Sequence, residues 1–249
     1  MHPSLRYTRH RDYPLPKTPW VMQQTWAQLL FMHWRVDREI MAAALPGGLE
    51  PDTYDGSAWI AVVPFTMRDV YPRYTTAVPW LSHFAELNVR TYVNVGGKPG
   101  VLFFSLDAAN PIAVEIARGW YRLPYLNARM SLKEQEAGWI DYASRRTDNR
   151  GRAAELRVRY RPTGLTYRAH PGTLEWFLTE RYCLYTLDAR GRLMRGEIHH
   201  EQWPLQRAEA EVEVNTLAGA AGFALDGTRP ELLHFVRGID VACWPIEEA

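Results

Sequence analysis

The chain has 249 residues, of which 47% are hydrophobic and 12% aromatic, and this composition supplies a large packed core and excludes a disordered chain. Its 29 basic and 28 acidic residues nearly cancel, which argues against a surface dedicated to nucleic acid or an anionic membrane. No apolar run is long enough to span a bilayer and the first residues lack a signal-peptide core, so we expect a cytoplasmic protein.

Amines and thiols are scarce. Only three of the 29 basic residues are lysines, namely Lys17, Lys98 and Lys133, so few groups are available for covalent amine catalysis. The two cysteines, Cys183 and Cys243, lie far apart and in no spacing typical of a metal site. We expect both to be buried free thiols rather than a disulfide.

The N-terminal part of the chain changes character at Trp20. Residues 1–19 carry four prolines among charged residues and are typical of an extended arm, which either wraps the domain or a partner subunit or is disordered. The apolar segment that follows, up to Val36, predicts a long strand from its Trp, Phe and Val content, although its spacing alone also fits a helix. Asp37 is a suitable N-cap for a short helix that ends before Pro46.

Strand patterns dominate the next segment. Residues 57–67 are almost continuously apolar and precede a loop that contains Pro72 and Pro79. Residues 83–95 alternate, so that one face carries Ala85, Leu87, Val89, Val93 and Val95 and the other carries Glu86, Asn88, Arg90, Tyr92 and Asn94. The glycine-rich turn at 96–100 predicts a hairpin with a returning strand at 101–106.

The remaining elements are short. Asn110-Pro111 predicts the start of a helix that ends near Gly119, and Thr173 is a suitable cap for a helix at 173–179. Further strands are predicted at 126–133, 139–146, 154–161, 181–187, 192–199, 207–215 and 234–244. We therefore expect one α+β domain at residues 20–249, built around an antiparallel sheet or barrel with a few short helices.

Three blocks of the sequence carry a resemblance to a known family, at residues 31–65, 84–130 and 178–205. Together they resemble a bacterial family of uncharacterised YqjF-like proteins, over nearly the whole chain from Trp20. The middle block is also similar to acetoacetate decarboxylase, in which a Glu-bearing strand, a glycine turn and a short helix with Arg precede a Tyr-Pro-Lys-Lys segment. The corresponding residues here are Glu86, Gly96-Gly97, Arg118 and Leu123-Pro124-Tyr125-Leu126.

This resemblance implies an acetoacetate-decarboxylase-like β-barrel with a polar cavity for a small carbonyl- or carboxylate-bearing molecule. The enzyme's lysine forms an imine with a β-keto acid, and a neighbouring cation lowers its pKa so that the amine is nucleophilic. In this chain Tyr125 replaces that lysine and Leu126 follows it, so neither position supplies an amine. We therefore do not expect decarboxylation through a Schiff base.

Three residues of the middle block are candidates for the site. The face that carries Glu86 either meets solvent or lines a cavity, where the carboxyl group would transfer protons. Arg118 would hold a carboxylate through its guanidinium fork, or it makes an internal ion pair or hydrogen bonds to carbonyls at the end of its helix. Tyr125 would donate a hydrogen bond to a carbonyl oxygen, or it only packs its ring.

Two histidines and a second arginine are further candidates for ligand binding. His199 and His200 are neighbours in a predicted strand, so at most one of them shares a cavity with His33; a structural histidine is the alternative. Arg181 resembles a family motif near the cavity, or it is an ordinary strand start. We expect no metal and no cofactor, because the metal, nucleotide and nucleophile motifs are all missing.

Two functions from different classes remain open. The first is an enzyme that acts on a small molecule without an imine, with Glu86 and Tyr125 as catalytic residues. The second is a non-catalytic module that binds or senses a small molecule. Neither nucleic acid nor a membrane is expected as a partner, and the resemblance to oligomeric enzymes is compatible with self-association.

Overall fold

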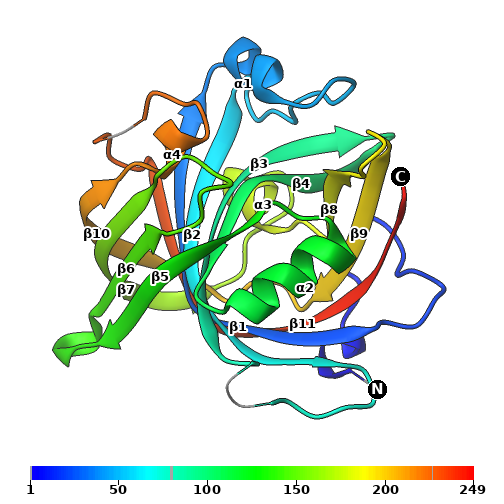
Figure 1. Ribbon diagram of the computed structural model, residues 1–249, viewed down its shortest axis with the longest axis horizontal. Coiled ribbons are helices and arrows are strands. Elements are labelled where there is room, and N and C mark those ends of the chain that lie inside the picture. The colour runs from blue at the N-terminus through cyan, green and yellow to red at the C-terminus, as the bar shows by residue number, and fades with distance from the viewer. Residues whose placement is uncertain (1, 79–80, 226) are drawn as a thin grey trace.

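The computed structural model describes residues 2–78, 81–225 and 227–249 (Figure 1). Strands dominate these residues. The strands are β1 (Met22–Val36), β2 (Ala58–Pro72), β3 (Phe84–Val95), β4 (Lys98–Ala108), β5 (Tyr125–Glu134), β6 (Ile140–Arg146), β7 (Glu155–Tyr167), β8 (Cys183–Leu187), β9 (Leu193–His200), β10 (Leu205–Asn215) and β11 (Leu232–Glu248). The α-helices are α1 (Arg38–Ala44), α2 (Pro111–Tyr121), α3 (Leu174–Thr179) and α4 (Leu217–Ala220), and the 3-10 helices are η1 (Pro3–Arg6) and η2 (Glu136–Gly138).

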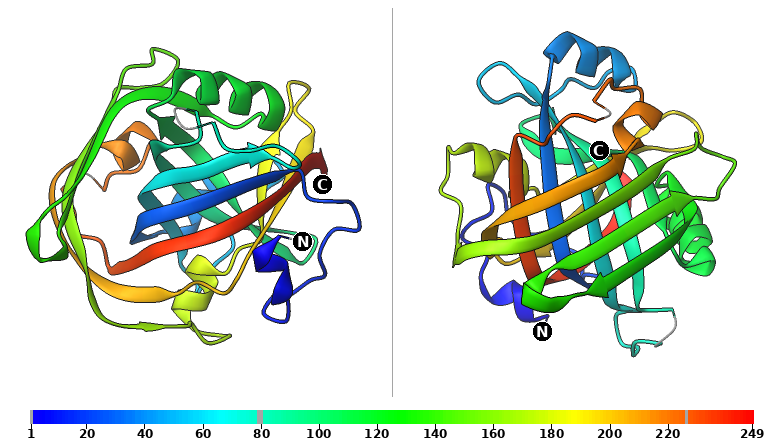
Figure 2. Two further views of the ribbon diagram at one scale, coloured as in Figure 1. Left: turned by 90° about the horizontal axis from the view of Figure 1, so that it is seen from below. Right: turned by 90° about the vertical axis from the view of Figure 1, so that its left-hand side faces the viewer.

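All the strands belong to one sheet that closes on itself. The strand order is β1-β2-β3-β4-β5-β6-β7-β10-β11-β9-β8, with additional pairings β1–β11 and β4–β8. These two extra pairings divide the sheet into two closed rings that share the wall β11-β1-β2-β3-β4. Figure 2 (left) shows this wall crossing the molecule, with β8 and β9 on one side and β5, β6, β7 and β10 on the other.

The two rings have different contents. The ring closed by β5, β6, β7 and β10 contains a packed apolar core, to which β1, β2 and β3 contribute Leu30, Ile60 and Leu87. Helix α4 adds Leu217 to this core. The ring closed by β8 and β9 surrounds the cavity described below. Because side chains of a strand alternate between its two faces, the shared wall faces a solid core on one side and the cavity on the other.

A bulge in β1 adjusts this alternation. Gln28 has a left-handed backbone with φ of 53°, and the β1–β2 register shifts between Ala27 and Met32. Before the bulge Gln24 and Trp26 line the cavity, whereas after it Leu29 does. One extra residue therefore keeps both halves of the strand facing the same cavity.

The sequence-based elements are mostly confirmed, and the architecture is a single α+β domain dominated by its sheet. Asp37, Asn110 and Thr173 cap α1, α2 and α3 as expected. Two details differ. Strand β2 continues through Pro72, while Pro79 lies outside the described residues. Helix α2 passes Gly119 and ends at Tyr121, because the left-handed position that terminates it is Arg122, with φ of 54°.

The sheet is not entirely antiparallel. β4 pairs in parallel with β5 near one end and with β8 nearer the other, and α2 is the crossover between β4 and β5.

The N-terminal segment packs on the outside of β9 and β11: Arg11 binds Glu197 at 3.1 Å and the Trp244 indole donates to the Thr18 carbonyl at 2.7 Å. Within the described residues, no helix is long and apolar enough to cross a membrane.

The β4–β8 pairing depends on the absence of a side chain at Gly100. A Cβ there would lie 2.7 Å from Cys183 Sγ and 2.8 Å from the Cys183 carbonyl oxygen. We expect Gly100→Ala to lower the free energy of unfolding by about 2–3 kcal/mol, measured by urea denaturation. Gly119→Ala is the matched control, since a Cβ there meets nothing within 4 Å and alanine favours a helix. Equal stability of the two variants would contradict the close packing of β4 against β8.

Candidate functional site

The cavity has a volume of about 290 Å³ and lies between the shared wall, β8, β9 and α2. Most of its lining side chains are apolar or aromatic, among them Trp26, Phe65, Phe103 and Trp203. A few polar groups converge on this apolar surface, which is the usual composition of a small-molecule site. These polar residues are Gln24, Glu86, Asn88, Arg90, Tyr121, Tyr125, Thr179, Arg181, Cys183, Glu197, His200 and Cys243.

Glu86 and Tyr125 form the central polar contact. Glu86 is in β3 and only 2% exposed, and Tyr125 is the first residue of β5 and 8% exposed. The Tyr125 hydroxyl donates to the Glu86 carboxyl group, at 3.1 Å from both Oε1 and Oε2. The phenol therefore holds the carboxyl group in a fixed orientation against the cavity wall.

Burial changes the protonation of this pair. Removal from water raises the pKa of Glu86 to about 8, although the hydrogen bond from Tyr125 lowers it, and the nearby Asp107 raises it further. Burial and the neighbouring carboxyl group raise the pKa of Tyr125 well above its ordinary value. At neutral pH Glu86 is therefore mostly the neutral acid, able to donate a proton, and Tyr125 is a neutral phenol.

The crossover through α2 brings Tyr125 to Glu86. The left-handed residue Arg122 ends the helix, and the chain then enters β5 with Tyr125 paired in parallel to Leu106. On the other side of β4, Ala108 is the register partner of Glu86. Leu106 pairs in turn with Asn88, so the Tyr125 backbone lies two strand spacings of about 4.8 Å from β3 and is offset by two residues from Glu86 along the strands, a gap that the two side chains span.

Two further polar groups on β3 lie on the same wall as Glu86. Asn88 and Arg90 follow it at every second position and are 6% and 7% exposed. Among the described residues, Asn88 Oδ1 and Arg90 Nε have no hydrogen-bond partner, and Arg90 makes no ion pair. Arg90 donates from Nη2 to the Leu178 carbonyl at 3.3 Å, interacts with the Tyr92 hydroxyl, and lies 5.1 Å from the centre of the Phe31 ring. A buried uncompensated guanidinium is costly, and an anionic ligand group would offset that cost.

The other charged residues of the lining are already compensated. Arg181 binds Asp52 at 2.6 Å, donates to the Phe177 carbonyl and stacks on the Phe177 ring. Glu197 accepts from Arg11 at 3.1 Å and from Lys98 at 2.6 Å. Arg181 therefore does lie at the cavity, as the sequence predicts, but its charge is shared with a carboxylate.

The histidines are arranged differently from the expectation. His200 lines the cavity, whereas His199 turns outward and contacts the Ser4 carbonyl of the N-terminal segment at 3.0 Å. His33 is fully buried against the Tyr92 hydroxyl, at 2.8 Å, and is not part of the lining. The structure therefore places neither His33 nor His199 in the lining: His199 faces the N-terminal segment, and His33 shares its strand face with Leu29 but contacts Tyr92 instead.

Arg118 also lies outside this cavity. Its Nη1 donates to the Tyr125 carbonyl at 2.7 Å from the outer side, so it fixes the backbone of the residue whose hydroxyl points inward. The expected position of Arg118 inside the cavity is not observed, because the face of α2 that carries it borders a different pocket.

Neither the amines nor the thiols offer a nucleophile in the cavity. Lys17, Lys98 and Lys133 are not among its lining residues. Cys183 and Cys243 are both free, buried and part of the lining. Burial raises the pKa of Cys243 to about 12 and also raises that of Cys183, so both thiols are protonated at neutral pH. In the described residues, no group of three or more His, Cys, Asp or Glu side chains could hold a metal ion.

The fold is of the acetoacetate-decarboxylase-like class. The enduracididine biosynthesis enzyme MppR complexed with pyruvate superposes with a TM-score of 0.60 at 13% identity, covering 100% of this chain and 97% of that chain. An acetoacetate decarboxylase-like enzyme from Sphingomonas wittichii RW1 gives a TM-score of 0.60 at 15% identity, covering 93% and 94%. At these identities the likeness establishes the fold only.

The family follows from sequence. Residues 23–240 match the DUF2071 family, described as an uncharacterized conserved protein. The chain is 42% identical over 240 residues to the uncharacterized protein YqjF of Bacillus subtilis (strain 168), covering 96% of this chain and 97% of that protein. The chain belongs to the DUF2071 family, which confirms the resemblance drawn from its three sequence blocks.

Sequence reasoning missed part of the lining. Asn88 and Arg90 were assigned to the same face as Glu86, but nothing in the pattern showed that Arg90 lacks an ionic partner. The contribution of His200, Glu197 and Trp203 depends on how β9 and the segment after it curve around the cavity. The alternating pattern of residues 83–95 was the one local signal that identified several lining residues together.

Proposed function

We propose that this protein binds a keto acid or a related carbonyl compound in the cavity and catalyses proton transfer next to the carbonyl group without forming an imine. The observation that carries the proposal is the neutral, buried Glu86 held by Tyr125 on the same wall as the uncompensated Arg90. The carboxyl group would donate to the carbonyl oxygen, and Arg90 would bind the ligand's carboxylate. His200, whose pKa burial lowers well below its ordinary value, supplies a neutral imidazole on the same lining.

The spacing of these groups suggests the length of the ligand. Glu86 and Arg90 are four residues apart on one strand, so their Cα atoms are about 13 Å apart along an extended chain. The Arg90 side chain spans part of that distance. The ligand must span the rest, from the guanidinium group to the Glu86 carboxyl group, which favours a keto acid of four to six carbons over a shorter one. The pyruvate complex of MppR supports the ligand class, because pyruvate is itself a keto acid.

A binding experiment tests the ligand class. We expect isothermal titration calorimetry to show tighter binding of levulinate than of pyruvate, with acetoacetate between them. Pentanoate lacks the keto group and 2-pentanone lacks the carboxylate, so each should bind at least about tenfold more weakly than levulinate. Arg90→Gln should weaken levulinate binding, whereas Arg129→Gln, an exposed arginine of β5, should leave it unchanged. Equal affinities across the series would contradict the assignment of Glu86 and Arg90.

Hydrogen–deuterium exchange tests the chemistry. We expect the protein in D₂O to accelerate deuterium incorporation at the carbons beside the keto group of levulinate, followed by proton NMR. Glu86→Gln should reduce this exchange by about 10²-fold or more while binding persists, because the amide cannot transfer the proton. Tyr125→Phe should reduce it less, because the phenol positions the acid.

The second candidate is a binding or sensing module without catalysis. It is favoured by the lack of a nucleophile: no lysine is among the described lining residues, and both thiols of the lining are protonated at neutral pH. A ligand that stabilises the protein in a thermal-shift experiment but retains all its protons in D₂O would support this alternative and contradict proton transfer.

A further inference from the structure

The cavity that contains Glu86 opens to solvent beside α2. Among its described lining residues only Pro72, Ile116 and Trp120 are exposed. In Figure 1 α2 lies in front of the ring closed by β8 and β9, with β4 above it and β1 and β11 below it. Pro72, the last residue of β2, pairs with Met22, the first residue of β1, so the opening lies at this end of the ring. We call this opening the mouth; its side chains are Met22, Val70, Pro72, Leu81, Ile116 and Trp120.

The mouth is apolar although it meets water. None of its side chains can be ionised, and the two contributed by α2 are large and half exposed, Ile116 at 49% and Trp120 at 53%. Exposed apolar side chains that continue into a cavity are typical of a surface that a ligand covers when it binds. The mouth therefore suits an uncharged, apolar part of a ligand.

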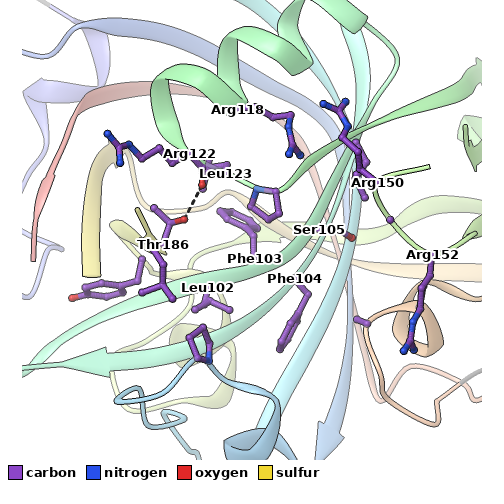
Figure 3. Close-up of a pocket in the computed structure, with 18 of the residues that line it drawn as sticks. Leu102, Phe103, Phe104, Ser105, Arg118, Arg122, Leu123, Arg150, Arg152 and Thr186 are labelled. Carbon is purple, nitrogen blue, oxygen red and sulfur yellow. Dashed lines mark hydrogen bonds between the residues drawn. The ribbon is translucent and has the colours of Figure 1, made fainter. Parts of the chain in front are cut away.

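The apolar side chains of α2 form a stripe on one face of the helix. Ile112, Ile116 and Trp120 follow each other at intervals of four residues and so lie one above the other. A different face, which carries Arg118, borders the separate pocket shown in Figure 3. Ile112 is also 49% exposed, but it does not line the cavity. The stripe thus contains two residues of the mouth and one equally exposed residue outside it.

The polar groups of the cavity lie in a fixed order behind the mouth. Strand β3 begins at Phe84, and Glu86 and Arg90 follow on the same wall. Phe84 pairs with Met67, and β2 then continues past the start of β3 to Pro72 at the mouth. Along the strand Glu86 is about 7 Å from Phe84 and about 13 Å from Arg90. Glu86 therefore lies between the mouth and Arg90.

This order determines how a keto acid can lie in the cavity. If its carboxylate binds Arg90 and its carbonyl oxygen accepts from Glu86, whatever is attached beyond the carbonyl group extends toward the mouth. We propose that the ligand is a keto acid with an alkyl tail on the far side of its carbonyl group, and that this tail occupies the mouth against Ile116 and Trp120. The inference rests on the function proposed above, which concerns the carbons between Arg90 and Glu86; the tail is additional. Each methylene group that leaves water in the mouth should tighten binding about two- to fourfold.

Calorimetry with a series of keto acids tests the tail on the intact protein. Levulinate ends in a methyl group beyond its carbonyl, whereas 4-oxodecanoate carries a hexyl tail there. Its isomer 9-oxodecanoate has the same atoms, but its added carbons all lie between the carboxylate and the carbonyl. We expect 4-oxodecanoate to bind at least about thirtyfold more tightly than levulinate and at least about tenfold more tightly than 9-oxodecanoate. The comparison of isomers separates the position of the tail from general hydrophobicity.

Variants of α2 locate the tail. Trp120→Ala and Ile116→Ser should each reduce the advantage of 4-oxodecanoate over levulinate by about fivefold or more, because they remove apolar surface from the mouth. Ile112→Ala is the matched control and should leave this ratio unchanged. All three side chains are exposed, so their replacement should preserve folding, which circular dichroism checks.

The possible outcomes distinguish this inference from the proposed function. Binding of levulinate with no gain for 4-oxodecanoate would overturn the tail and leave the proposed function standing, whereas failure of both keto acids to bind would overturn both. Equal loss of the advantage in all three variants would contradict the mouth as the site of the tail. So would dissociation of an oligomer by Trp120→Ala in sedimentation velocity, because a second copy of the chain would then cover the mouth.

Discussion

We expect Glu86→Gln to stabilise the protein at alkaline pH, with a gain over the wild type that grows as the pH rises from about 4.5 to 8. Burial raises the pKa of Glu86 in the folded state to about 8, while 4.5 is its ordinary value. Between these values the folded protein holds a proton that the unfolded chain has released, so wild-type stability falls as the pH rises. The difference is roughly 5 kcal/mol above pH 8, since each pKa unit corresponds to about 1.4 kcal/mol.

Urea denaturation of both proteins between pH 4.5 and 9 measures this effect. The glutamine is isosteric and its carbonyl oxygen still accepts from the Tyr125 hydroxyl, so the variant isolates the ionisation. Glu136→Gln is the matched control, because Glu136 is an exposed residue of the turn between β5 and β6. A stability difference between Glu86→Gln and wild type that stays constant with pH would show that Glu86 does not carry a raised pKa.

Arg146→Met lowers the free energy of unfolding by about 3–5 kcal/mol, because it leaves the buried Asp107 carboxylate without its cation. The arginine, in β6, connects β4 with the segment that follows β6. Its Nε donates to both oxygens of Asp107, at 3.1 and 3.2 Å, and its Nη2 donates to Ser105 at 3.0 Å. Nη1 donates to the Arg152 carbonyl at 2.7 Å, and both charged side chains are at most 4% exposed.

A double variant separates the lost pairing from the lost side chain. Asp107→Leu combined with Arg146→Met removes both charges and should recover most of the stability, since an apolar pair of similar size often replaces a buried ion pair without loss. Arg145→Met, at the exposed neighbouring position, should change stability by less than about 0.5 kcal/mol. If the double variant were no more stable than Arg146→Met, the stranded charge would not be the cause.

Local pattern predicted the part of the site that lies on one strand. Residues 83–95 alternate with a period of two, so Glu86, Asn88 and Arg90 had to share a face whatever the rest of the fold did. The helix caps were equally local, because a side-chain oxygen bonds to amides only two or three residues away. These features hold in the structure for the same reason that they were visible in the sequence.

The positions of the remaining candidates depend on contacts between distant segments. Which of His199 and His200 meets the cavity is decided by the register of β9 against β11, and a shift of one residue would exchange them. The side of the sheet that Arg118 faces is decided by how α2 packs after the crossover. Gln28 adopts a left-handed backbone without being glycine, so its bulge has no signature in the sequence.

The closure of the sheet has a consequence for biosynthesis. The wall shared by the two rings is complete only when β1 pairs with β11. Met22 is the register partner of Cys243, so this pairing joins segments that are far apart in the sequence. A chain emerging from the ribosome can form the β1–β4 meander early, but it lacks the closing strand until β11 has been made. Pairing of such distant segments is slow, so the nascent protein exposes the open edge of β1 while the strands between them are synthesised.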